Sequence, residues 1–307
     1  MKALVITLLS LVLVYFVYCF IMFVVACVRR KPDPGTENPN STWYRYRDMI
    51  NSGIKWFKGL PSEEVHIKSR DGLDLCGHYV KNGQSRNTII LAHGYRSNRF
   101  IDFACAFKLY YDLGFNMLSI DMRAHGDSEG RYILFGIAER YDIVDWAKFL
   151  NDKYHPDKIV LDGMSMGAAT VLMTADLDLP KNVAGIIADC GYTTPKAIWS
   201  HVAKKDMHSI PWLVMPGVCL IVRLFTGYDP NGASAVESLK KAKVPVLFVH
   251  GEADGFVPCE MGRENYAACA SPKTLVTVPG AAHGCSFLID PEKCSRALEK
   301  FLREILK

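Results

Sequence analysis

The chain of 307 residues lacks several patterns that would assign it to a common class. None of its ten cysteines forms a C-x-x-C pair, and no compact spacing of a usual zinc or calcium site is present. It has no phosphate-binding P-loop and no GxGxxG dinucleotide motif, and it contains no internal repeat or low-complexity tract. We therefore expect chemistry that works without a cofactor or a metal.

Charge is also sparse. The formal net charge is +4, and no long block of lysine and arginine occurs. The charge pattern is therefore not that of a nucleic-acid-binding protein. Half of the residues are hydrophobic, which is enough for a substantial core. Cysteines without a regular framework are more typical of a reducing compartment than of a disulfide scaffold.

Charged side chains are absent from residues 3–28. About 26 residues of helix span roughly 39 Å, more than the roughly 30 Å of a bilayer's hydrocarbon core. The sequence therefore predicts an N-terminal transmembrane anchor over residues 1–30. A cleaved signal peptide and a lipoprotein signal are alternatives, since Val-Val-Ala-Cys at 24–27 resembles a lipobox that ends at Cys27.

The charges beside this segment predict its orientation. Arg29, Arg30 and Lys31 follow it, whereas only Lys2 and the α-amine precede it. Positive charge favours the cytoplasmic side, so we expect the C-terminal domain in the cytoplasm. The glycosylation sequon that begins at Asn40 points the other way.

Residues 31–60 are predicted to form a linker and an amphipathic juxtamembrane segment. Residues 31–40 are rich in proline, asparagine and glycine. Residues 43–58 place apolar side chains at helical spacing, with arginines and lysines on the other faces. This helix lies along the membrane, or it packs against the globular domain with a solvated basic face.

From Pro61 onward, strands and helices alternate, which predicts one α/β domain over residues 61–307. Two β-rich runs flank Asp71-Gly72 and predict a hairpin. The expected strands are 64–68, 73–80, 88–92, 115–120, 158–161, 183–188, 246–249 and 274–278. The expected helices are 101–113, 137–153, 165–177, 260–270 and 291–306. Continuous apolar strands indicate a mostly parallel, eight-stranded sheet with helices on both faces.

About fifty residues between two of these strands exceed an ordinary loop. This interval is too apolar to remain in solvent, and we predict a helical cap insertion at about residues 195–242. An apolar inner surface of the cap would favour an acyl or aromatic substrate group.

The sequence Gly-Met-Ser-Met-Gly at 163–167 follows a β-rich run and precedes a run of small and aliphatic residues. This strand-turn-helix context is typical of a nucleophile elbow, in which Ser165 sits on a strained turn. The glycines on either side leave room for the strand and helix to approach closely. We predict Ser165 as the nucleophile, with an accessible hydroxyl.

A serine nucleophile needs a histidine base and a carboxylate that orients it. Elbow-bearing hydrolases place them in the order Ser, acid, His. Asp254 follows an apolar strand, and His283 is the one histidine downstream of it. Glu252 is an alternative acid. Asp229 and Asp290 are weaker ones.

The oxyanion formed by attack on a carbonyl needs hydrogen-bond donors. We assign them to the backbone N–H groups of Met166 and Tyr95, the latter in the loop after the strand at 88–92. Residues 121–130 carry acidic and histidine side chains, and we interpret them as a structural turn bridged by Arg123 and Asp127. His93, His125 and His250 each neighbour a glycine and are expected to hold loops by hydrogen bonds.

The sequence resembles the α/β-hydrolase fold superfamily, and within it the serine aminopeptidase-like branch and membrane-anchored bacterial hydrolases of that type. The matching segments are 92–95, 121–130, 163–167, 250–254 with 257–258, and 282–283. The resemblance implies a nucleophile at Ser165, an acid at Asp254, a base at His283 and oxyanion donors at Tyr95 and Met166.

We expect a membrane-tethered serine hydrolase that cleaves a carboxylic ester or thioester through an acyl-enzyme. Its partners would be a small acyl ester or short peptide and the membrane, with no nucleic acid. A peptidase of aminopeptidase type is an alternative, with Glu252 or Asp229 as the anchor for the substrate amine. A non-catalytic, membrane-tethered binding module is another, because a fold alone does not fix function.

Overall fold

The computed structural model describes residues 1–31, 36–39 and 41–307, and in these residues eight strands form one sheet. The sheet has the order β1-β2-β4-β3-β5-β6-β7-β8. β1 pairs with β2, and β2 with β4, in antiparallel fashion, and every other pairing is parallel. The predicted hairpin and mostly parallel sheet are confirmed.

The strands agree with the expected ranges to within three residues at each end. They are β1 Ser62–Lys68, β2 Asp74–Val80, β3 Asn87–Ala92, β4 Asn116–Ile120, β5 Lys158–Met164, β6 Val183–Asp189, β7 Val246–Gly251 and β8 Lys273–Val278. The central strands are apolar along their length because helices cover both faces of a parallel sheet.

Helices pack on both faces of the sheet and enclose two core clusters. Outside the N-terminal helix and the cap, these elements are η1 Thr42–Tyr46, α2 Arg47–Lys58, α3 Phe107–Asp112, α4 Glu139–Tyr154, α5 Met166–Leu172, α9 Cys259–Ala268, α10 Ser286–Ile289 and α11 Pro291–Ile305. One cluster includes side chains of α4, α5 and the cap, and the other includes side chains of α2, α3 and α11.

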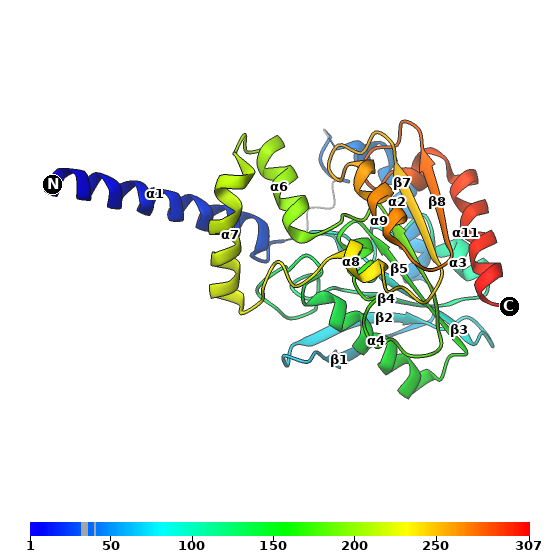
Figure 1. Cartoon of the computed structure of the whole chain (residues 1–307). Helices are drawn as coiled ribbons and strands as arrows, with labels where there is room; N and C mark the ends of the chain where they lie inside the picture. The colour runs from blue at the N-terminus through cyan, green and yellow to red at the C-terminus, as the bar shows by residue number, and fades with distance from the viewer. Residues whose placement is uncertain (32–35, 40) are drawn as a thin grey trace.

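Between β6 and β7 the chain forms α6 Pro195–Lys205, α7 Pro211–Thr226 and α8 Ala235–Leu239. α6 and α7 stand away from the sheet, and α7 lies beside the second half of the N-terminal helix, whereas α8 lies close to the sheet (Figure 1). Thr194 caps α6 by accepting a hydrogen bond from the Ala197 N–H, and Gly227 ends α7 in a left-handed conformation.

The N-terminal helix, α1 Lys2–Cys27, projects from the body of the molecule past α7 (Figure 1). Of the helices in the described residues, it alone is long and apolar enough to cross a membrane, with a mean hydropathy of 2.8. Its residues up to position 14 are exposed, but its second half packs on the cap. The Tyr15 hydroxyl donates to the Leu213 carbonyl at 2.9 Å, and Cys19 is fully buried. No pattern in the sequence predicts this contact.

α2 packs against the globular domain rather than beside α1 (Figure 1). The Phe57 ring stacks on Phe107 with centroids 3.8 Å apart. Gly53 lies so close to Ala104 that an added Cβ would meet its carbonyl oxygen at 2.0 Å. Of the two alternatives for residues 43–58, packing on the domain is therefore the arrangement observed. Asn40 of the sequon, and residues 32–35 of the expected linker, lie outside the described residues.

Candidate active site

Ser165 occupies a sharp turn between β5 and α5 with a φ of 55° and a ψ of −112°. This positive φ is strained for a residue with a side chain. An added Cβ on Gly163 would lie 2.3 Å from the Gly167 carbonyl carbon, and one on Gly167 would lie 1.9 Å from the Ala92 oxygen. Only glycine fits these two positions, so the strand and helix close tightly around the serine.

Ser165, His283 and Asp254 form one hydrogen-bonded chain. His283 Nε2 lies 2.8 Å from Ser165 Oγ, and its Nδ1 lies 2.7 Å from Asp254 Oδ2. The three residues come from the β5–α5 turn, the loop after β8 and the loop after β7. These loops follow the carboxyl ends of three parallel strands of the sheet, where sheets of this class carry their ligand sites.

Asp254 is fully enclosed, and its other oxygen is also satisfied. Oδ1 accepts the backbone N–H groups of Phe256 and Val257 at 2.9 and 2.8 Å. Burial alone raises the pKa of the Asp254 carboxyl, but hydrogen bonds from His250 and His283 outweigh it and hold the pKa below its usual range. The carboxylate is therefore ionised at neutral pH, so Nδ1 of His283 carries the proton and Nε2 is free to accept one from Ser165.

The loop after β3 lies directly against the nucleophile. An added Cβ on Gly94 would lie 3.2 Å from Ser165 Cβ, and Tyr95 is the next residue. In the described residues the Tyr95 N–H donates to no backbone carbonyl. Met166 begins α5, so its N–H has no acceptor within the helix. Both expected oxyanion donors thus carry amides available to a ligand.

Ser165 is buried, with 6% of its surface exposed, which differs from the accessible hydroxyl expected from an elbow at an open sheet end. Gly94 abuts the Ser165 Cβ, and His283 bonds its hydroxyl.

His93 and His125 hold the surrounding loops, as expected. One ring nitrogen of His93 contacts the Gly94 carbonyl, and one ring nitrogen of His125 contacts the Arg123 carbonyl. The second ring nitrogen of His93 accepts the Met122 N–H, and that of His125 accepts the Arg96 N–H. Burial lowers the pKa of His93 to about 4 and that of His125 to about 3, so both rings are neutral.

The expected bridge between Arg123 and Asp127 is wrong. Arg123 pairs with Asp142 at 2.6 Å and with Asp71 at 2.8 Å, whereas Asp127 pairs with Arg99 at 2.6 Å. Asp142 lies on α4, a longer-range partner that sequence proximity could not reveal. The turn is still held by ion pairs, but these connect it to other elements.

The alternative acids face other partners. Glu252 accepts a hydrogen bond from the Thr277 hydroxyl at 2.7 Å. Asp229 accepts from the backbone and side chain of Asn231, and Asp290 caps α11 by accepting from the Lys293 N–H. None of these three hydrogen bonds involves His283.

Two contacts that sequence analysis missed support the histidine and its acid. The Trp43 indole N–H, from η1, donates to the His283 carbonyl at 3.1 Å. His250 Nε2 lies 3.6 Å from Asp254 Oδ2 and 2.9 Å from the Val257 carbonyl. Trp43 is 240 residues from its partner, so no local pattern pointed to it.

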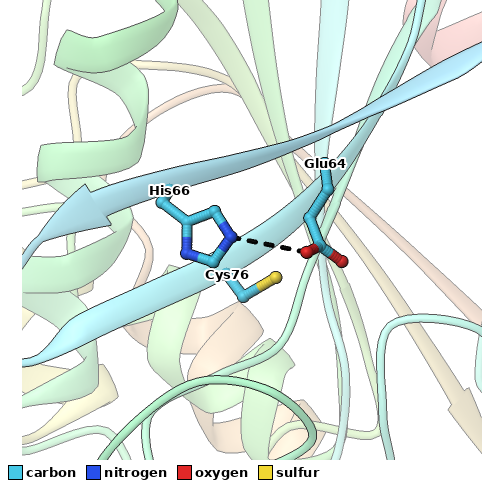
Figure 2. A group of neighbouring side chains, drawn as sticks. All are labelled: Glu64, His66 and Cys76. Atoms are coloured by element: carbon cyan, nitrogen blue, oxygen red, sulfur yellow. Dashed lines mark hydrogen bonds and ion pairs between the residues drawn. The ribbon is translucent and has the colours of Figure 1, made fainter.

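Two groups of side chains in the described residues bring three possible metal-ligand atoms together. Glu64, His66 and Cys76 lie on β1 and β2, and Figure 2 shows His66 turned toward the Glu64 carboxylate. The Arg99 guanidinium donates to Cys76 Sγ and pairs with Glu64, so a positive charge already neutralises this cluster.

The second group is Cys190, Asp254 and His283. Burial raises the pKa of the Cys190 thiol well above its usual range, which disfavours the thiolate that a metal requires. The other two residues already bond one another. Neither group has the chemistry of a metal centre.

Comparisons with known proteins agree with this fold. A family model described as alpha/beta hydrolase fold matches residues 87–214, and one described as TAP-like protein matches residues 226–305. The chain is 28% identical to the uncharacterized protein YqkD of Bacillus subtilis, covering 84% of this chain and 85% of that one.

Two named enzymes are also similar. The lysophosphatidylserine lipase ABHD12 of Danio rerio is 24% identical over 81% of this chain and 63% of its own. The solved structure of the Pyrococcus furiosus esterase Pf2001 superposes with a TM-score of 0.67 at 23% identity, covering 91% of this chain and 99% of the esterase.

Proposed function

The chain belongs to the α/β-hydrolase superfamily, and from this we propose that it is a serine hydrolase that cleaves carboxylic esters or thioesters through an acyl-enzyme. One observation carries the proposal: His283 lies 2.8 Å from the Ser165 hydroxyl and 2.7 Å from an ionised Asp254 carboxylate. That arrangement has the geometry of a nucleophile, a general base and its orienting acid.

In the proposed reaction, Ser165 Oγ bonds to the carbonyl carbon while His283 Nε2 takes the hydroxyl proton. The N–H groups of Tyr95 and Met166 stabilise the oxyanion. Collapse of this intermediate breaks the ester bond, and the leaving alcohol or thiol takes the proton from His283. Water then attacks the acyl-enzyme, gives its proton to His283, and the acid departs as Ser165 regains that proton.

An ester is a better candidate substrate than a peptide with a free N-terminus. An aminopeptidase needs a carboxylate beside the substrate amine, but Glu252 and Asp229 are engaged by Thr277 and Asn231. The similarity to a named esterase and a named lipase supports the same choice.

A fluorophosphonate probe tests the nucleophile. We expect the full-length protein to be labelled and Ser165→Ala to lose labelling entirely. A matched control is Ser286→Ala, because Ser286 is buried nearby and bonds Asp189 instead. Labelling that persists in Ser165→Ala would refute the assignment.

Turnover of p-nitrophenyl acyl esters, compared with aminoacyl anilides, separates the esterase from the peptidase. If the protein takes no label and cleaves neither class, a non-catalytic binding module remains.

We also propose that residues 1–30 are a single-pass anchor, that residues 31–60 link it to the hydrolase domain at 61–307, and that this domain faces the cytoplasm. A cleaved signal or lipoprotein processing at Cys27 would detach α1, yet α1 is packed on the cap and Cys27 is buried. Ten free cysteines suit a reducing compartment.

Carbonate extraction should leave the full-length protein in the membrane. Protease added outside sealed cells should leave the C-terminal domain intact. Release of a shortened protein from the membrane would contradict this topology. Digestion of the C-terminal domain in cells that have not been lysed would contradict it as well.

A further inference from the structure

A cavity of about 190 Å³ lies between the end of α1 and the cap. Its lining is mostly apolar and includes Met22 and Ala26 of α1, Trp199 and Val202 of α6, and Met215 of α7. Loop residues, among them Tyr95, Arg96 and Phe256, complete it. Concave, apolar spaces of this kind bind hydrocarbon groups.

The cavity adjoins the reactive groups through two of its lining residues. Tyr95 follows Gly94, which abuts Ser165, and the Phe256 ring lies 5.0 Å from the His283 ring. Two residues that flank the reacting groups, Tyr95 and Phe256, therefore also line this cavity.

α1 is a fixed wall of the cavity rather than a loose tether. The Tyr95 hydroxyl donates to the Ala26 carbonyl at 2.8 Å. Arg29, just beyond the helix, donates to the Ser128 carbonyl at 2.7 Å. The Phe23 ring packs against Phe225 of α7 with centroids 5.5 Å apart.

The length of α1 places this wall at the bilayer. Residues 2–14 are exposed and cover only about 20 Å at helical rise, roughly 10 Å less than the hydrocarbon core. If α1 spans the membrane, the cap-bound half of the helix must lie partly inside it. The outer side of α7 suits this position, since it exposes Trp212, Leu220 and Leu224.

We propose that the cavity is an acyl-chain site and that α1 determines chain-length specificity, so that the substrate is a long-chain acyl ester drawn from the bilayer. The proposal deepens the serine hydrolase function proposed above and rests on it. It assigns to the N-terminal helix a role in substrate binding as well as attachment.

The first test fills the cavity from α1. Ala26→Phe in the full-length protein in detergent should lower the ratio of kcat/KM for p-nitrophenyl dodecanoate to that for the acetate at least tenfold. Ala3→Phe makes the same change on the exposed part of α1 and should leave the ratio unchanged.

Val202→Phe fills the same cavity from α6, so the test does not depend on one variant folding. It should also lower the ratio. An unchanged ratio in folded Ala26→Phe and Val202→Phe would overturn the proposal.

The second test needs no catalysis. Dodecanoic acid brominated at its methyl end should quench Trp199 fluorescence in the Ser165→Ala protein, and Trp199→Phe should remove that component of the quenching. Quenching without hydrolysis of any ester would refute the enzyme and keep the acyl site. Hydrolysis without Trp199 quenching and without a change in the chain-length ratio would refute the acyl site and keep the enzyme.

Discussion

Asp254 holds His283 with one carboxylate oxygen while two backbone amides hold the other. The carboxylate therefore cannot turn away, and the imidazole keeps a single tautomer with its acceptor nitrogen toward Ser165. The tautomer of the base depends on this one side chain.

Replacing Asp254 by asparagine should keep the shape of the site but allow the wrong tautomer of His283. We expect kcat on a short acyl ester to fall by about 10⁴-fold. Glu252→Gln, two residues away, is the control and should keep kcat within about twofold. A loss below about tenfold in Asp254→Asn would mean that another group orients the histidine.

The acid side of the stability profile should report the same carboxylate. Because the pKa of folded Asp254 is lowered, its ionised form stabilises the folded state above the usual carboxyl pKa of about 4. That stabilisation is lost as the pH falls through the lowered value. The difference in Tm between the wild type and Asp254→Asn should thus narrow below about pH 4. A difference that stays constant down to pH 2 would contradict the lowered pKa.

At the residue scale, the sequence predicted which side chains meet, because the order of nucleophile, acid and histidine leaves His283 as the single choice after Asp254. It did not predict the contacts of His250 and Trp43 with this group. Those contacts depend on how distant loops fold, and no motif encodes them.

Among the elements, η1 has an effect out of proportion to its five residues. Trp43 donates to the His283 carbonyl, and an added Cβ on Gly284 would lie 2.6 Å from the Trp43 ring. The segment before the hydrolase domain therefore fixes the loop that carries the base.

Trp43→Phe should keep most of the packing and remove the indole donor. One hydrogen bond contributes about 1 kcal/mol, so we expect kcat to fall about fivefold through a less well-positioned His283. The pH dependence of kcat should also shift, a change that loss of packing alone does not predict. Trp56→Phe, on α2, is the matched control; equal effects in both variants would show that only stability had changed.

The strands were predicted more accurately than the helices, because a short continuous run of apolar residues defines a buried strand well. The helix expected at 101–113 begins only at Phe107. Before it, Asp102 accepts the Gly94 N–H, and Asn98 accepts the Phe100 N–H. These local bonds compete with the helix, and the sequence does not show them.

At the scale of the whole molecule, the second half of α1 packs against the hydrolase domain. The second half of α1 is part of the largest core cluster together with the sheet and the cap. Hydropathy predicted the helix but not its contact with α7, since a segment that faces lipid and one that faces protein are equally apolar.

A shortened chain beginning at Ser41 should therefore behave poorly. It loses Tyr15 and Cys19, which lie against Gly217 of α7, and it opens one wall of the cavity. We expect aggregation without detergent and, in detergent, a Tm several degrees below that of the full chain. A monodisperse shortened protein with the full-length Tm would show that α1 contributes nothing to the fold.

The contact between α1 and the acyl cavity also affects how the reaction rate should be measured. If the enzyme takes its ester from within the bilayer, its rate depends on the concentration of ester per unit area of membrane. In vesicles, the rate of the full-length protein should follow the mole fraction of ester in the surface, and inert phospholipid added at constant bulk ester should slow it. Surface dilution, rather than molarity in the aqueous phase, then sets the apparent KM.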